Sequence, residues 1–271
     1  MILYLDDELG AIWQEQDVFR LLGELQGKIY RQVKGRRTLQ FELQGRSYFL
    51  KFHSGVGWHE IIKNLLQFRL PIIGAANEWQ AIQRLEELGI DTMTVVAFGR
   101  RGLNPAAQES FLVTRELENT VSLEEYCSSW HEQAPAFGVK KALIEKVAAI
   151  SRRMHEAGIS HRDFYLCHFH LLPDSEQNNG TGEPQLFLID LHRALIKKNL
   201  GKRWTTKDIA GLYFSSMEIG LTTRDRLRFA RAYRNASLRE TLEWDRRFWN
   251  AVVQRGQSLY HKLGNPLRTT Q

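Results

Sequence analysis

The sequence predicts an α+β protein in two parts: a small antiparallel sheet on the N-terminal side and a larger, mostly helical C-terminal part. Three observations predict it. Apolar and polar residues alternate over 39–43, which is the period of a half-buried strand. Apolar residues recur at helical spacing between Leu143 and Met154. The remainder, from Thr205 on, has a pattern that is mostly typical of helices.

The strand-rich part contains a hairpin followed by a helix. Gln44-Gly45 is a turn signal that joins the 39–43 strand to a second strand over 47–52. A helix is expected from Asn77, a candidate N-cap, to Leu88, where Gly89 follows as a stop signal. Short apolar runs predict further strands at 93–99 and 111–114.

The helix-rich part begins with the helix that carries the 143–154 pattern, and Gly158 ends it. Segment 173–184 is polar and rich in Gly and Asn, which predicts a surface loop between two strands. The two parts join near residues 114–119, and we expect a cleft between them. The expected domains are residues 1–115 and 116–271.

Composition narrows the function classes. The 271 residues carry a formal net charge of +6, which suits an anionic partner: nucleic acid, an acidic membrane surface or an acidic protein. Two cysteines, Cys127 and Cys167, make no disulfide framework and favour the cytosol. The N-terminal stretch lacks the features of a signal peptide. The best apolar run, 65–74, contains Arg69 and Pro71, so no membrane span is expected.

Two acidic residues carry the strongest functional signal. Asp163 ends a His-Arg-Asp motif after the predicted helix, and Asp190 follows the apolar run 186–189. Phosphotransferases need this pairing, because one carboxylate accepts the acceptor's hydroxyl proton and the other holds Mg²⁺ on the phosphates of ATP. A solvated loop is the ordinary alternative for an isolated His-Arg-Asp motif.

Lys51 and Glu78 form a second candidate pair. Lys51 lies in the middle of the second hairpin strand, where it is either an exposed position or a cation directed into a cleft. Glu78 shares a helical stripe with Ile82 and Leu85, so it lies on the packed face and requires a partner there. Lys51 is well placed to be that partner. Glu60 competes with Glu78 as the carboxylate that pairs with Lys51.

The segment 27–38 occupies the position of the loop that covers the ATP phosphates in kinases, although it has only two glycines. An ordinary basic loop is an equal alternative. Read in order, this segment, Lys51, Glu78, a linker at 111–117, a long helix, Asp163 and Asp190 follow the linear order of protein-kinase-like folds. Chance reproduces the whole order far less often than any single part.

Three other interpretations stay open. The His and Asp cluster could bind a transition metal for hydrolysis, since His168 and His170 alternate on an extended segment. A nucleotide-binding scaffold without chemistry is a second, although the presence of both Asp163 and Asp190 opposes it. A phosphotransferase that acts on a protein, or on another small sugar or alcohol, would use the same site residues.

In detail the sequence resembles the lipopolysaccharide core heptose(I) kinases of Gram-negative bacteria, from about Trp13 to Phe229. The motifs that carry the resemblance are the segments 161–169, 189–194, 48–53, 60–66, 77–79 and 211–217. The resemblance implies a bilobal protein-kinase-like fold. It also implies ATP-dependent phosphorylation of the first heptose of the inner core, on the cytoplasmic side of the inner membrane.

By that resemblance Asp163 is the catalytic base, Asp190 a Mg²⁺ ligand, Lys51 the α/β-phosphate contact and Glu78 its ion-pair partner. Protein kinases place an Asn five residues after the catalytic Asp, and here that position is His168. His168 is therefore a candidate metal ligand with an unusual donor atom, because Mg²⁺ prefers oxygen. Leu191 and His192 replace the Phe-Gly that usually follows the metal-binding Asp.

The resemblance also implies partners. The acceptor sugar is attached to a lipid, so we expect a cytoplasmic protein that is peripheral at the inner membrane. The basic surplus and the apolar-basic stretch 61–70 favour binding to an anionic membrane surface. An acidic carrier protein is the other partner that this charge suits, and no nucleic acid is expected.

Overall fold

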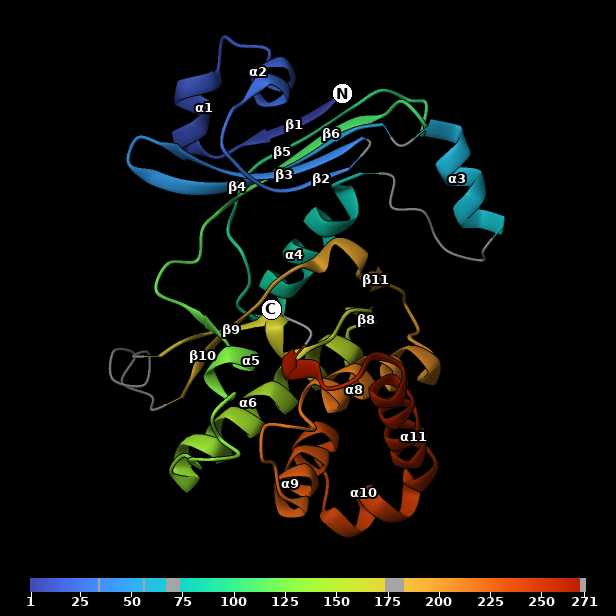
Figure 1. The fold of residues 1–271 in the computed structure, drawn as a ribbon. Coiled ribbons are helices and arrows are strands. Elements are labelled where there is room, and N and C mark those ends of the chain that lie inside the picture. The colour runs from blue at the N-terminus through green and yellow to red at the C-terminus, as the bar shows by residue number, and fades with distance from the viewer. Residues whose placement is uncertain (34, 56, 67–73, 174–182, 269–271) are drawn as a thin grey trace. The chain divides into compact units, whose positions relative to one another are not determined.

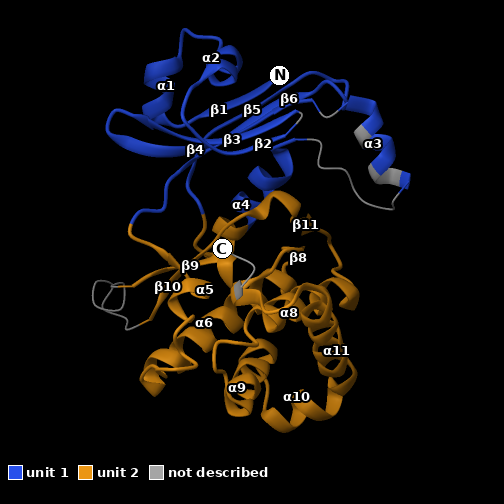
Figure 2. Ribbon diagram, in the orientation of Figure 1, with its two compact units in different colours: residues 1–84, 93–118 blue, residues 85–92, 119–271 orange. Residues whose placement is uncertain are grey.

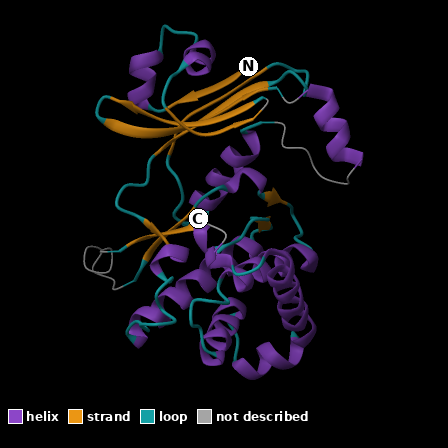
Figure 3. Cartoon of the chain, viewed as in Figure 1, coloured by secondary structure: helices purple, strands orange, loops and turns teal. Residues whose placement is uncertain are grey.

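The structure is a computed structural model that describes residues 1–33, 35–55, 57–66, 74–173 and 183–268 (Figure 1). It contains two compact units (Figure 2). Unit 1 comprises residues 1–84 and 93–118, and unit 2 comprises residues 85–92 and 119–271. Strands dominate unit 1 and helices dominate unit 2, as Figure 3 shows. The α+β class and the order of its two parts are confirmed.

Unit 1 is built on a six-stranded antiparallel sheet in the order β1-β5-β6-β4-β3-β2. Its strands are β1 (Ile2–Leu5), β2 (Lys28–Val33), β3 (Arg36–Leu43), β4 (Arg46–Ser54), β5 (Val95–Arg101) and β6 (Glu109–Arg115). The predicted hairpin is β3–β4, with Leu43 opposite Arg46. Gln44 and Gly45 both have positive φ, the conformation of a two-residue hairpin turn whose twist matches that of the strands.

One face of this sheet is the apolar core of unit 1. Alternate residues of the hairpin, including Leu39, Leu50 and Phe52, pack there against Phe19 and Leu22. Phe19 and Leu22 belong to a helix that covers this face together with its neighbour (Figure 1). The helices of unit 1 are α1 (Asp7–Trp13), α2 (Val18–Glu24), α3 (Gly57–Leu66) and α4 (Ala76–Glu87), whose last residues, from 85 on, belong to unit 2. Asp6 and Asp17 cap the first two through their carboxylates.

Helix α4 carries the predicted stripe. Glu78, Ile82 and Leu85 are all buried, so the helical period identified the packed face correctly. The helix begins at Ala76, so the prediction of Asn77 as its N-cap is wrong: Asn77 lies within the first turn. Gly89 stops the helix with φ of 61°, which a residue without Cβ adopts at little cost.

Unit 2 is mostly helical. Its helices are α5 (Leu123–Tyr126), α6 (Phe137–Glu156), α8 (Lys202–Ser215), α9 (Thr223–Arg234), α10 (Leu238–Trp244) and α11 (Arg246–Leu263), with short 3₁₀ turns η1 (Leu166–His168), η2 (Leu191–Arg193) and η3 (Pro266–Arg268). The 143–154 pattern lies on α6, and the helix ends before Gly158, as predicted. Full capping boxes begin α9 and α10, where Thr222 and Ser237 are the N-caps.

The short strands of unit 2 hold the segments that carry the acidic residues. They are β7 (Val121–Ser122), β8 (Ile159–Ser160), β9 (Phe169–Leu172), β10 (Gln185–Leu188) and β11 (Leu195–Ile196). Strand β9 lies between β7 and β10, and β8 pairs with β11. The predicted loop 173–184 joins β9 to β10, and residues 174–182 of it lie outside the described residues. No helix in the described part of the chain has the length and apolar character needed to cross a membrane.

Candidate active site

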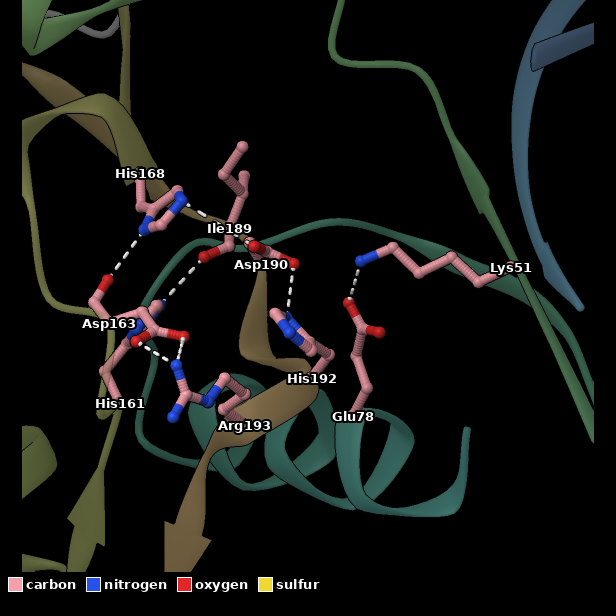
Figure 4. Close-up of polar contacts among 9 residues, drawn as sticks. All are labelled: Lys51, Glu78, His161, Asp163, His168, Ile189, Asp190, His192 and Arg193. Atoms are coloured by element: carbon pink, nitrogen blue, oxygen red, sulfur yellow. Dashed lines mark hydrogen bonds and ion pairs between the residues drawn. The ribbon is translucent and has the colours of Figure 1, made fainter. Parts of the chain in front are cut away.

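Unit 1 contains the predicted ion pair. Lys51 Nζ lies 2.6 Å from Glu78 Oε1, and Figure 4 shows the two side chains pointing toward each other. The side chain of Glu78 is only 3% exposed and that of Lys51 is 24% exposed. A carboxylate this buried requires a cation or several donors. The side chain of Glu60, the competing candidate, lies outside the described residues.

Local structure explains how the pair forms. Leu50 and Phe52 point into the apolar core, so the pleat of β4 directs Lys51 to the opposite face of the sheet. Next to Glu78 on α4, Trp79 stacks on Phe98 of β5, with ring centroids 4.0 Å apart and planes 15° apart. This stacking fixes the first turn of α4 against the sheet.

The segment expected to cover phosphates, 27–38, forms β2, a turn and the start of β3, with residue 34 outside the described residues. Gly27 is required there, because a Cβ would lie 2.2 Å from the carbonyl oxygen of Gln40. Arg37 of this segment donates to the carbonyl oxygens of Leu22 and Gly23 at the end of α2.

In unit 2, Asp163 lies on a loop that is fixed by a buried carboxylate. Asp208 of α8 accepts hydrogen bonds from the backbone N–H groups of His161 and Arg162, each at 2.8 Å. Its Oδ2 also lies 3.3 Å from His155 Nε2. Because Asp208 is 1% exposed, removal of its charge would leave these donors unpaired inside the protein. Asp208 therefore sets the position of the loop and of Asp163.

His161 connects this loop to the strand that precedes Asp190. Its side chain donates from Nε2 to the carbonyl oxygen of Ile189 at 2.9 Å. Burial is the main cause that lowers the pKa of His161, which favours the neutral ring. The two acidic segments, 27 residues apart in sequence, are thus joined by a partly buried hydrogen bond (Figure 4).

The carboxylate of Asp163 contacts one arginine. Arg193 Nη1 lies 2.8 Å from Oδ1 and 3.0 Å from Oδ2 of Asp163. A carboxylate has about four lone-pair sites, so this single nitrogen leaves sites for a hydroxyl donor. Arg193 orients the carboxylate without occupying it fully.

Asp190 follows β10 in a left-handed conformation, with φ of 59°. Asp tolerates this region better than most residues, because its short polar side chain can hydrogen-bond locally. Its Oδ1 lies 2.8 Å from His192 Nδ1, and its Oδ2 lies 3.6 Å from His168 Nε2. His168 Nδ1 donates to the backbone carbonyl oxygen of Asp163 at 2.7 Å. His168 therefore contacts both acidic segments.

This donor set fits a divalent cation. His168 Nδ1 bonds to the carbonyl oxygen of Asp163, so the other ring nitrogen, Nε2, faces Asp190 Oδ2 at 3.6 Å. Asp190 offers the charged oxygen that Mg²⁺ prefers, and the imidazole nitrogen is the less usual ligand.

The histidine pair of the hydrolase interpretation does not form. His168 lies in the η1 turn and contacts Asp163, whereas His170 lies on β9 with Nδ1 3.1 Å from Thr120 Oγ1. Among the described residues, no group of three or more His, Cys, Asp or Glu side chains is arranged to hold a metal ion.

Unit 2 also contains an apolar cavity of about 360 Å³. Its walls come from α5, α6, α8, α9 and α11, and they include Leu143, Val147, Leu212, Ile219 and Val252. Cys127 also lines it, and burial raises the pKa of this thiol to about 12, which keeps it protonated. The periodicity of α6 predicted its packed face, but the cavity has no signal in the sequence.

Asp208 and Arg193 were not identified from the sequence as site residues. The structural role of His161 was not identified either. Asp208 had a usable signal. It precedes Ile209 and shares a helical stripe with Leu212, so it lies on a packed face by the argument that identified Glu78. The contact between Arg193 and Asp163 had none, because it joins two irregular segments.

The chain is similar to known proteins over most of its length. The model of the lipopolysaccharide kinase (Kdo/WaaP) family matches residues 22–233. A lipopolysaccharide core heptose(I) kinase WaaP of Pseudomonas aeruginosa (strain PAO1) is 47% identical over 262 residues, 97% of each chain. The protein of the same name from Escherichia coli K12 is 47% identical over 256 residues, 94% of this chain and 96% of the relative.

A solved structure of WaaP in complex with acyl carrier protein superposes with a TM-score of 0.82 and 43% sequence identity. The alignment covers 96% of this chain and 100% of that one. The predicted kinase-like fold is confirmed by this likeness. Because the chain matches both the family model and these relatives over most of its length, it belongs to the lipopolysaccharide kinase (Kdo/WaaP) family and is a kinase of lipopolysaccharide core biosynthesis.

Proposed function

We propose that this kinase transfers the γ-phosphate of ATP to a hydroxyl of the first heptose of the lipopolysaccharide inner core. The observation that carries the proposal is the anchored loop of Asp163, joined through His161 to the segment of Asp190. The near-complete alignment with relatives named heptose(I) kinases supports the choice of acceptor.

Each residue has a distinct role in the proposed reaction. Asp163 accepts the proton of the acceptor hydroxyl, while Arg193 holds its carboxylate in one orientation. Lys51 contacts the α- and β-phosphates of ATP, and Glu78 fixes its ammonium group. In this proposal residues 1–115 bind ATP, and residues 116–271 provide the base and the acceptor site.

Asp190 and His168 are the residues that would hold Mg²⁺. Mg²⁺ supplies positive charge that neutralises the phosphate oxygens during transfer. His192, through its contact with Oδ1, fixes the rotation of the Asp190 carboxylate.

The proposal is tested on the product. Mass spectrometry of core oligosaccharide should show one phosphate fewer in cells that lack the gene, and the wild-type gene should restore it. Purified enzyme should also transfer ³²P from Mg-ATP to lipopolysaccharide isolated from the deletion strain. An unchanged phosphate content, or transfer to a protein in place of the sugar, would contradict the proposal.

An acyl carrier protein is the partner that we propose for unit 2. The apolar cavity suits an acyl chain, and α9, which borders it, carries five arginines and one acidic residue. Arg224, Arg226 and Arg231 of this helix are exposed. Arg226 lines the cavity, so this basic helix borders an apolar interior, an arrangement that suits an acidic carrier with a fatty acyl group.

We expect the acyl-loaded carrier to bind more tightly than the carrier with a bare thiol, because each buried CH₂ contributes about 0.8 kcal/mol. Val253 of α11 lines the cavity and is 38% exposed, so Val253→Trp should fill the space without strain. This variant should lose the preference for the acyl form in calorimetry. The exposed neighbour Gln254, replaced by Trp, is the matched control. Equal wild-type affinity for both forms would contradict the prediction.

Association with an anionic membrane surface completes the proposal. Helix α3 exposes Trp58, Ile62 and Leu66, at 55%, 52% and 76%, and their spacing places them on one side of the helix. Lys63 lies beside this stripe. An apolar stripe flanked by a cation is typical of a helix that lies in a membrane interface. Residues 67–70 of the predicted stretch lie outside the described residues.

Binding to vesicles that contain anionic lipid should fall steeply as salt increases, since each Lys or Arg near the surface contributes about 1 kcal/mol, screened within roughly 8–10 Å. The double variant Trp58→Ser, Ile62→Ser should weaken binding in a flotation assay. Leu103→Ser is the matched control, because Leu103 is fully exposed elsewhere in unit 1. Equal binding to neutral and anionic vesicles would exclude the electrostatic contribution.

A further inference from the structure

A cluster of cations lies beside Asp163 in unit 2, and few of its donors are used. Arg162, Arg193 and Lys207 are each partly buried and influence one another electrostatically. The carboxylates that face them are those of Asp163 and Asp208. Three cations against two carboxylates leave a positive surplus at the position where the acceptor hydroxyl would bind.

The donors of the cluster point to a missing anion. Arg193 uses only Nη1 on Asp163, and its Nη2 and Nε make no hydrogen bond to a described residue. Arg162 Nε is buried without a partner, and its one side-chain bond, from Nη1 to the carbonyl oxygen of Arg193, is 3.5 Å long. Buried polar groups are normally paired, so the orphaned Nε and the unused donors of Arg193 are open to an ion, a ligand or a water molecule.

Lys207 has the same character. It makes no hydrogen bond or ion pair with any described residue, although it is partly buried next to two arginines. Burial and the repulsion of Arg193 and Arg162 lower the pKa of Lys207. A cation held against other cations is costly unless an anion joins them. The fold retains Lys207 there at the start of α8, immediately before the buried Asp208.

The cluster is also held in place from one side. The guanidinium carbon of Arg162 lies 5.5 Å from the ring centroid of Trp204, in the first turn of α8. Arg162 has φ of 72°, a strained backbone conformation for a long side chain. The stacking and the backbone together direct its guanidinium group toward Arg193. The site is therefore preorganised, as a binding site requires.

We propose that Arg162, Arg193 and Lys207 form a subsite that binds an oxyanion of the acceptor, a carboxylate or a phosphate, next to the hydroxyl that Asp163 deprotonates. This inference rests on the proposed function and adds how the acceptor is recognised. Guanidinium groups match the planar geometry of such oxyanions. Recognition there favours acceptors that carry a negative charge near the reacting sugar over neutral sugars.

Lys207 is the residue to test, because it does not contact Asp163. Lys207→Gln should raise KM for lipopolysaccharide from the deletion strain about tenfold or more, the cost of losing one charged hydrogen bond, and leave KM for ATP within about twofold. Lys207→Arg should keep the acceptor KM within about threefold. Lys198→Gln removes an exposed charge outside the cluster and should have no effect. Melting curves of all variants check that they fold.

Chemically altered acceptors identify the oxyanion. One preparation has its carboxylates reduced to alcohols, and the other has its phosphates removed. The change that removes the recognised group should raise the wild-type KM to the value of Lys207→Gln and have no effect on that variant. If neither change affects the wild type, or if Lys207→Gln behaves like Lys198→Gln, the subsite does not exist.

Failure of the proposed function would give a different result. In that case the wild-type enzyme transfers no phosphate to lipopolysaccharide, whatever residue stands at position 207. The subsite is then tested directly with inorganic sulfate. Sulfate should raise the melting temperature of the wild type more than that of Lys207→Gln. An equal shift in both proteins would overturn the proposal without use of the acceptor.

Discussion

Asp163→Ala is expected to lower kcat about 10²- to 10⁴-fold, the usual contribution of a positioned general base, and to leave the affinity for Mg-ATP largely unchanged. The expectation rests on the fixed geometry of the loop. Asp208 holds the backbone of His161 and Arg162, so loss of the Asp163 side chain should not displace the segment. Single-turnover phosphate transfer, with nucleotide binding measured by fluorescence, checks both parts.

Asp91→Ala is the matched control, since Asp91 is an exposed aspartate of the same unit and should be dispensable. Asp163→Ala also frees Arg193 from its carboxylate, so Arg193→Ala should be measured beside it. If Asp163 only positioned Arg193, the two variants would lose activity equally. Turnover close to wild type in a folded Asp163→Ala protein would remove Asp163 from the proposed mechanism.

The parts of the fold that follow from local periodicity were predictable. The β3–β4 hairpin has a strict alternation and a Gln-Gly turn, and α6 has a clear helical period. Glu78 was predictable because a carboxylate on an apolar stripe requires a partner, and Lys51 lies on a nearby strand. In each case the neighbours that determine the structure are close in sequence or share one face.

The rest depends on contacts that join distant segments. Strand β2 is exposed along its whole length and has no alternating pattern, so its pairing with β3 could not be predicted from residues 27–38. Asp208 lies 46 positions beyond Arg162, whose backbone it holds. The wrong N-cap at Asn77 has a local cause, because helix boundaries vary by a residue or two with small differences in packing.

The second large effect is expected for the ion pair of unit 1. In Lys51→Ala, Glu78 stays buried without its cation, and a buried charge that loses its partner costs on the order of 3–5 kcal/mol. The free energy of unfolding should therefore fall by about this amount in urea. KM for ATP should rise too, because Lys51 is the proposed phosphate contact.

The double variant separates these two causes. Adding Glu78→Gln to Lys51→Ala removes the stranded charge, so part of the lost stability should return while KM for ATP stays high. Glu78→Gln alone should cost less than Lys51→Ala, since Lys51 is 24% exposed and can reach water, whereas Glu78 is 3% exposed. Additive losses in this double-mutant cycle would show that the pair contributes no coupling energy, and that the buried Glu78 is stabilised by other donors.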